Sequence, residues 1–507
     1  MSLPFLSTII FAPLLGVLVL FFIPKEKAGL IKWIGILATL PSLVLAVSAY
    51  VLSQRGADVS KWYEHVTWFQ LNGGKQQDLG QYLYAVAYEV GVDGFALLLM
   101  VLTAFVSTMA AIASLKIEKE WKGYFQLFLL LELGMLGVFA AENMILFFLF
   151  FEVTLISTFF LIGKWGYLLK ERAAYSFLLY NGLGSAILLI VIMILFARAG
   201  TVNFDLLGAV IQDESTFHLA RMTPELRTGL LIGIIIAFGI KLPIFPFHTW
   251  MVHVHAQAPP PIVMLHSGIL LKIGAYGLIR FGLEIFPREF AGIGNILIIL
   301  GVINLLYGAF LALIQDDLKK VLAYSSVSHM GIVLVGLGAL NMEGIQGAMF
   351  QVISHGLISA LFFFLVGVLY ARAGTTKISE LGGLVKSVPI LAGLILTAGL
   401  ASLGIPGMSG FISEFTAFVG LFKSWPVAGY IALLGLILTA VYVLRACLGI
   451  TYGEFKQRKQ EWKDIQSFEW LPSSLLVASI IAIGVFPAIL TEPLFTSLQT
   501  IIEGLGG

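Results

Sequence analysis

Three ionisable side chains between residues 150 and 275 of this chain stand inside long apolar stretches. Glu152 lies in ILFFLFFEVTLISTFF, Lys241 in GIIIAFGIKLPIFPFHTW and Lys272 in MLHSGILLKIGAYGLIRF. An ionisable residue at the middle of a bilayer costs at least about 2.5–3.5 kcal/mol on insertion scales, so it persists where it is paired, hydrated or used. These residues are therefore the first candidates for chemistry that moves charge inside a membrane.

The second half of the chain carries a similar set. His329 lies in AYSSVSHMG, His355 in FQVISHGLISALFFF and Glu414 in ASLGIPGMSGFISEFTAF. Glu132 in LLLELGML and His248 in the FPFHTW segment are added as secondary candidates. Carboxylates, lysines and histidines share one property, which is that each can gain or lose a proton.

These residue types suit the transfer of protons. A nearby carboxylate stabilises the ammonium form of a buried lysine, so movement of the carboxylate can switch the lysine between holding and releasing a proton. Arginine stays charged and would not serve this purpose, whereas histidine can pass protons between such groups. The sequence therefore predicts a proton path over six residues: Glu152, Lys241, Lys272, His329, His355 and Glu414.

Within this predicted path, Glu152 and Lys241 form one switchable couple. Lys272 then passes protons through the two histidines toward Glu414. The alternative is that the charged residues are structural pairs that hold helices together, and that the histidines form ordinary hydrogen bonds between helices. The structural alternative requires four independent buried charges to coincide, so we favour the path.

A second group of histidines, His248, His253, His255 and His266, is reminiscent of a metal site. No carboxylate or thiol accompanies these histidines, and Cys447 is the only cysteine, so we expect no metal. The GxGxxG and GxxxxGK[ST] motifs are absent, and we expect no nucleotide or redox cofactor bound by this chain.

The composition places the chain in a membrane. Apolar residues make up 59% and charged residues 12% of its 507 residues, against roughly 45–50% and 25% in soluble proteins. The net charge of +1 provides no basic field for nucleic acid, and long continuous apolar runs exclude a β-barrel. Runs of about 20 residues, the length that a spanning helix needs, predict an all-α polytopic membrane protein with about 14 transmembrane helices. The approximate limits of the spans are 3–23, 30–52, 91–114, 124–141, 143–163, 174–197, 229–247, 259–281, 292–314, 320–340, 346–370, 389–422, 427–452 and 471–494.

Two of these spans are interrupted. Pro243 and Pro246 break the seventh, and Pro406 with neighbouring glycines breaks the twelfth. Interrupted spans at corresponding positions of two halves mark the site of transporters built from inverted repeats. The two spans are five apart, and an odd-numbered repeat places its second copy upside down. The predicted parts are 1–123 with helices 1–3, 124–281 with helices 4–8, 292–452 with helices 9–13, and 471–507 with helix 14.

The connections between spans predict the orientation. The odd-numbered connections hold eighteen lysines and arginines and the even-numbered ones nine, so the odd connections face the cytoplasm and both termini face outward. The last odd connection holds the basic cluster Lys456, Arg458, Lys459 and Lys463. The long even connections, 53–90 and 198–228, are expected to lie as amphipathic pieces at the outer interface. The first span follows no basic segment or A-x-A site, so we expect it to be retained.

Six strings of the sequence resemble the antiporter-like subunits of respiratory complex I, and among them the M-type subunit, which is chain four in mitochondria. The strings are FGIKLPIFPFHTW, HAQAP, GILLKIGAYGLIRF, AYSSVSHMG, FQVISHGLISALFF and GIPGMSGFISEF. The resemblance covers most of the chain and is densest between Glu142 and Phe418. It implies fourteen helices in two inverted five-helix repeats, with half-channels joined by a central hydrophilic axis.

The resemblance also implies roles for individual residues. The Glu–Lys couple of the family falls on Glu152 and Lys241, its central lysine on Lys272 and its terminal glutamate on Glu414, while His329 and His355 match its axis histidines. A terminal glutamate favours the M type, since the L and N types and the sodium/proton antiporter relatives have lysine there. Two features depart from the M type: MVHVH replaces the usual LPDAH stretch, and His266 in MLHSG is similar to the L-type and antiporter pattern.

The resemblance implies a proton-translocating subunit of an NADH-quinone oxidoreductase in the cell inner membrane or an equivalent energy-coupling membrane. Its partners would be the L-type and N-type membrane subunits, and NADH, FMN, Fe–S clusters and quinone would bind to partner subunits. Alternatives are a subunit of a multisubunit sodium/proton antiporter or membrane-bound hydrogenase, and a structural membrane spacer.

Overall fold

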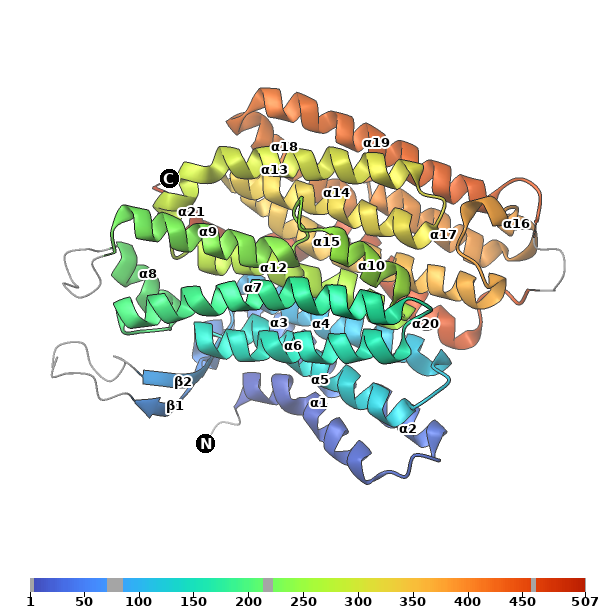
Figure 1. The fold of residues 1–507 in the computed structure, drawn as a ribbon, viewed down its shortest axis with the longest axis horizontal. Coiled ribbons are helices and arrows are strands. Elements are labelled where there is room, and N and C mark those ends of the chain that lie inside the picture. Colours follow the sequence, from blue (N-terminus) through green and yellow to red (C-terminus); the bar gives the residue numbers. More distant parts are fainter. Residues whose placement is uncertain (1–3, 71–84, 213–221, 457–461, 507) are drawn as a thin grey trace.

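The computed structural model describes residues 4–70, 85–212, 222–456 and 462–506. Long helices run side by side along one direction, as Figure 1 shows. Within the described residues, twelve helices are long and apolar enough to cross a membrane. The bounds of the first helices are α1 Phe5–Phe22, α2 Ala28–Leu37, α3 Leu40–Gln54, α4 Gly94–Ala113, α5 Trp121–Ala140, α6 Met144–Trp165 and α7 Lys170–Ala199. Helices α2 and α3 together form one of the twelve crossings, and the segment Pro260–Leu283 forms another. The later uninterrupted helices are α13 Pro287–Ile314, α14 Leu318–Gly338, α15 Met342–Ala373, α19 Pro426–Thr451 and α20 Ser467–Val485.

Two further crossings are broken in the middle. One consists of α9 (Pro224–Lys241) and α10 (Thr249–Gln257), and the other of α17 (Pro389–Ser402) and α18 (Ser409–Ser424). The prolines that predicted these breaks lie within them. The seventh span was expected to end at residue 247, which is wrong, because α10 carries the chain on and places the break inside the crossing.

Side chains of neighbouring helices satisfy the backbone freed at the first break. Phe245 N–H donates to Asn304 Oδ1 over 2.7 Å, and Asn304 Nδ2 donates to the Pro243 carbonyl over 3.2 Å. The Trp250 indole N–H donates to the Ile240 carbonyl over 3.1 Å. Non-helical backbone at membrane depth requires such partners, so Asn304 on α13 stabilises the break next to Lys241.

The crossing between α10 and α13 changes helix type along its length. It consists of α11 (Pro260–Leu265), a π-helical segment η4 (His266–Leu270), α12 (Leu271–Gly277) and a second π-helical segment η5 (Leu278–Leu283). The whole stretch is buried. Turns of π-helix inside α-helices occur frequently at functional sites, and this crossing carries Lys272.

Glycines bring α13 and α14 into close contact. A Cβ atom at Gly331 would lie 2.5 Å from the Gly301 carbonyl oxygen, and one at Gly308 would lie 2.6 Å from the Ser328 nitrogen. Small residues at a helix interface let two backbones approach within a membrane. This contact fixes α14, which carries His329, at the centre of the bundle.

The bundle has two different ends. Figure 1 shows both chain termini at the same end as strands β1 (Glu64–Gln70) and β2 (Ala85–Val90) and helix α8 (Phe204–Gln212). The strands pair antiparallel, with Glu64 opposite Val90. We call this the hairpin end. The expected amphipathic piece is found as α8, but the strands were not predicted. The last span was expected to run to residue 494; it ends at Val485, and α21 (Ala488–Gly504) follows separately at the hairpin end.

A buried carboxylate joins three helices at the opposite end, where short helix α16 (Leu384–Ser387) lies. Glu469, at the start of α20, is 0% exposed and accepts bonds from Arg372 Nη2 on α15 over 2.6 Å and from Lys116 Nζ over 2.5 Å. Arg372 also donates to the Lys463 and Asp464 carbonyls. Of the basic cluster, Arg458 and Lys459 lie outside the described residues.

Candidate functional site

Lys272 is the centre of the candidate site. It lies on α12 and is 0% exposed. Its Nζ donates to the Ser267 carbonyl over 2.6 Å and lies 2.7 Å from His355 Nδ1 on α15. The close contact brings together two residues predicted from the sequence to exchange protons, and the geometry permits transfer between their nitrogens.

His329 on α14 continues the line toward the broken crossing. The centroids of the His329 and His355 rings are 5.5 Å apart. His329 Nδ1 lies 3.5 Å from Glu414 Oε1 on α18, and its Nε2 lies 3.3 Å from the Ser402 hydroxyl on α17. The structure thus brings Lys272, both histidines and Glu414 together in one buried cluster.

Glutamine and serine side chains support this cluster, and sequence reasoning missed them. Gln351 Nε2 lies 3.1 Å from His329 Nδ1, and Gln351 Oε1 accepts from the Ser413 hydroxyl over 2.5 Å. Ser354 donates to Ser409 over 2.8 Å. The signal in the sequence was the four-residue spacing of Gln351 and His355 on α15, which places both on one helix face.

Glu414 lies against the break of the second interrupted crossing. A Cβ atom at Gly404 would lie 2.5 Å from Glu414 Oε2, and Gly404 has a positive φ of 65°. The glycine therefore allows both the turn of the backbone and the approach of the carboxylate. Glu414, on α18, thus places its carboxylate beside the turn at Gly404.

The predicted couple of Glu152 and Lys241 is not joined by a bond between the two side chains. Within the described residues, no hydrogen bond or ion pair reaches Lys241 Nζ or Glu152 Oε1. The Lys241 ammonium group lies over the rings of Phe151 and Phe177, 4.9 Å and 5.6 Å from their centroids. Phe151 precedes Glu152 on α6, so Lys241 packs against the helix that carries Glu152, while no bond joins the two side chains within the described residues.

Two histidines left out of the predicted path lie between the lysines. His255 Nε2 on α10 is 2.9 Å from His266 Nδ1 at the start of η4, and both rings are fully buried. His266 also packs on Phe177, with ring centroids 5.8 Å apart. The Lys241 ammonium group lies over the same Phe177 ring. His255 and His266 lie in the two stretches that depart from the M type, MVHVH and MLHSG.

The secondary candidates remain apart from this cluster. Both carboxylate oxygens of Glu132 on α5 are buried and have no hydrogen-bond partner among the described residues. His248 lies at the first break and stacks against Phe245 and Tyr307. Within the described part of the chain, no group of three His, Cys, Asp or Glu side chains is arranged to hold a metal ion.

Asp93 makes a helix-capping contact and Arg445 an interface contact. The Asp93 carboxylate caps α4 by accepting from the Ala96 N–H over 2.7 Å. Arg445 donates to the carbonyls of Leu313 and Gln315 at the end of α13.

Comparison with known families gives one match over most of the chain. The family described as "NADH:quinone oxidoreductase/Mrp antiporter, TM" matches residues 141–440. "NAD(P)H-quinone oxidoreductase chain 4" of Prochlorococcus marinus (strain NATL2A) is 36% identical over 99% of this chain and 92% of that relative. The protein of the same description, numbered chain 4 1, from Synechococcus elongatus is also 36% identical, over 96% of this chain and 90% of its own length.

Solved structures share the fold. A chain of respiratory complex I from Thermus thermophilus superposes with a TM-score of 0.85 and 28% identity, covering 99% of this chain and all of that one. A chain of the Mrp complex from Dietzia sp. DQ12-45-1b superposes with a TM-score of 0.82 and 20% identity, covering the whole of both chains.

The contact at Gly404 generates a test of how Glu414 is held. We expect Gly404→Ala to lower the melting temperature of the purified protein, because a side chain at positive φ costs about 1–2 kcal/mol and its Cβ would collide with the Glu414 carboxylate. The matched control is Gly393→Ala on α17, the helix that precedes the break, where nothing lies within 4 Å of the added atom. Equal melting temperatures for the two variants would contradict the assigned contact.

Proposed function

The chain belongs to the membrane-spanning family of NADH:quinone oxidoreductase and Mrp antiporter subunits, and we propose that Lys272, His329, His355 and Glu414 carry protons through it. The protein is a proton-translocating membrane subunit of an NAD(P)H-quinone oxidoreductase of the complex I type. It works in a multisubunit complex with other membrane subunits. The line of contacts from Lys272 to Glu414 inside an apolar bundle is the observation that carries the proposed path.

The proposed transfer begins at Lys272. Its ammonium group gives a proton to His355 Nδ1, which lies 2.7 Å away, and becomes a neutral amine. The proton continues by way of His329 to Glu414 Oε1, 3.5 Å from His329 Nδ1. Gln351 and Ser402 orient the His329 ring from both of its nitrogens, and they change no charge themselves.

Lys241 and Glu152 form the input side of the same proposal. The open arrangement of the couple leaves the Lys241 amine without a hydrogen-bond partner in the described residues. Approach of the Glu152 carboxylate would stabilise the ammonium form, and its withdrawal would release the proton. The His255–His266 pair stands between Lys241 and Lys272 and supplies ring nitrogens over that interval.

The wider assignment follows from the family. We place the inverted repeats at 124–281 and 292–452, with 1–123 and 471–507 outside them. NADH, FMN, Fe–S clusters and quinone are assigned to partner subunits, and the L-type and N-type subunits are the proposed membrane neighbours. The likeness to the Mrp complex is one of fold, and the higher identity to chain 4 proteins favours the oxidoreductase over an antiporter or hydrogenase subunit.

The proposed path predicts that a titratable group is needed at position 414. Glu414→Gln keeps the shape of the side chain but cannot take up a proton, so we expect normal assembly, at least about tenfold slower proton pumping and slower quinone reduction, because the two are coupled. Glu414→Lys should retain more activity than Glu414→Gln, since lysine can also carry a proton. Pumping by purified complex in liposomes is the measurement. Wild-type pumping by Glu414→Gln would remove this residue from the path.

The charge of the connections supports an orientation with the hairpin end outside, in an inner or equivalent energy-coupling membrane. Lys463 is exposed at the opposite end. We expect Lys463→Cys, in a background where Cys447 is replaced by serine, to react with an impermeant thiol reagent only from the cytoplasmic side. Reaction from the outer side alone would reverse the orientation.

A further inference from the structure

A column of polar side chains leads away from Lys272 toward the hairpin end. Lys272, Tyr276, Arg280 and Glu284 follow one another at intervals of four residues. Lys272 and Tyr276 share one face of α12. The buried Tyr276 hydroxyl accepts from Arg280 Nε over 3.1 Å and donates to the Phe139 carbonyl over 3.1 Å. The path to Glu414 makes no use of this column.

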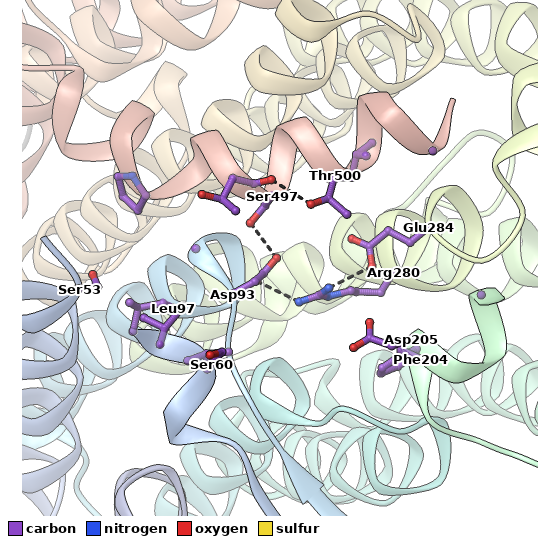
Figure 2. Close-up of a pocket in the computed structure, with 18 of the residues that line it drawn as sticks. Ser53, Ser60, Asp93, Leu97, Phe204, Asp205, Arg280, Glu284, Ser497 and Thr500 are labelled. Atoms are coloured by element: carbon purple, nitrogen blue, oxygen red, sulfur yellow. Dashed lines mark hydrogen bonds and ion pairs between the residues drawn. The ribbon is translucent and has the colours of Figure 1, made fainter. Parts of the chain in front are cut away.

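The column ends in a cavity at the hairpin end. Arg280 donates to Asp93 on α4 and to Glu284, both over 3.0 Å, and Ser497 on α21 donates to Asp93 over 2.9 Å (Figure 2). The cavity has a volume of about 790 Å³ and is lined also by Asp205 and Glu492. Figure 2 shows Asp205 on the other side of Arg280 from Asp93.

A second cavity adjoins the first around the same arginine. It has a volume of about 530 Å³ and is lined by Glu89, Asp205 and Glu142, which stands in the loop between α5 and α6. His65 Nε2 on β1 lies 3.4 Å from the Glu89 carboxylate. The Glu142 carboxylate lies on the backbone of Gly91, where a Cβ atom would be 2.9 Å from Oε1.

One guanidinium group cannot neutralise this many carboxylates. Arg280 forms its ion pairs with Asp93 and Glu284, whereas no ion pair within the described residues joins Glu142 to a cation. Burial raises the pKa of Glu142 to about 8. The positive charge of Arg280 lowers this pKa, and the negative charges of Asp93, Asp205 and Glu284 raise it. Burial likewise raises the pKa of Glu284 to about 7. Carboxyls at this end can therefore hold a proton near neutral pH.

We infer that the cavities around Arg280 form a proton-exchange site between the interior of the bundle and water at the hairpin end, with Glu142 as the group that holds the proton and Tyr276 as its link to Lys272. The inference rests on the proposed function, because Lys272 must release protons for the column to carry any. It adds a second branch to the path, separate from Glu414.

The exchange is a sequence of proton transfers with no change in the residues. A proton leaves the Lys272 ammonium group, which becomes a neutral amine, and binds to the Tyr276 oxygen while the hydroxyl releases its own proton, so the tyrosine is unchanged. The Glu142 carboxylate takes up the released proton. Its O–H bond then breaks toward water, which leaves the carboxylate and a hydronium ion. Arg280 stays charged and stays paired with Asp93, so the arginine itself neither takes up nor releases the mobile proton.

The competing explanation is a clamp that only fastens α4, η5 and α21 together. A clamp needs the Asp93–Arg280 and Ser497–Asp93 bonds, but neither the titration of Glu142 nor the hydroxyl of Tyr276. Variants at Glu142 and Tyr276 therefore separate exchange from fastening.

The test uses the intact complex in liposomes and varies the pH on the side of the hairpin end between about 6 and 9. If Glu142 releases protons there, wild-type pumping should fall as this pH falls through about 8, because the carboxyl then stays protonated. Glu142→Gln should remove this dependence, and Tyr276→Phe should slow pumping without abolishing it, because the branch through Glu414 stays open. The matched controls are Glu343→Gln, a half-buried carboxylate paired with Lys423, and Tyr124→Phe, a buried tyrosine bonded to Ser114. Both should behave as the wild type.

The outcomes distinguish failure of the exchange site from failure of the proposed function. Wild-type rates and pH dependence in Glu142→Gln and Tyr276→Phe, beside slow pumping by Glu414→Gln, would overturn the exchange site and leave the proposed function standing. Wild-type pumping by all three would overturn the proposed function as well. If Glu142→Gln does not assemble, Gly91→Ala displaces the carboxylate instead, and an unchanged pH profile in that variant would equally overturn the inference.

Discussion

The cost of an unpartnered charge in a low-dielectric interior is the constraint on which this structure depends. A buried ion needs a partner or hydrogen bonds, and loss of one partner leaves the other exposed to the full penalty. The chain meets this constraint in two ways. Glu469 is saturated by Arg372 and Lys116 and serves only to join helices, whereas Lys241 and Glu152 are left open. A buried charge whose partners are all present holds the helices in place, whereas an incompletely paired group is free to change its protonation.

The irregular parts of the bundle follow from the same constraint. Groups that exchange protons must lie close to one another although they come from different helices. The break at Gly404 lets the Glu414 carboxylate approach a turn of backbone, and the glycine contacts between α13 and α14 hold His329 at the necessary depth. Asn304 satisfies the backbone at the other break. The helices thus depart from regular geometry next to the buried charged residues that they position.

Much of this was predictable from the sequence, because apolar runs and charges within them are strong local signals. The all-helical class, the two broken crossings and the cluster of Lys272 with His355 and Glu414 were predicted from such patterns, and the cluster is found in the structure. The hairpin of β1 and β2 was not predicted, because the sequence of this connection shows no clear alternation of apolar and polar residues. The His255–His266 contact was missed because it depends on a turn between α10 and α11, and a spacing of eleven residues predicts no contact.

Lys272 lies at the centre of the proposed proton path, and the substitution Lys272→Arg tests its role most directly. Arginine keeps the positive charge and can reach His355, but it does not release a proton at accessible pH. The measurement is the rate of proton pumping by the intact complex in liposomes, with the exposed Lys423→Arg as control. We expect slower pumping in Lys272→Arg and a normal rate in the control. A normal rate in Lys272→Arg would show that this residue supplies charge only and does not carry the proton.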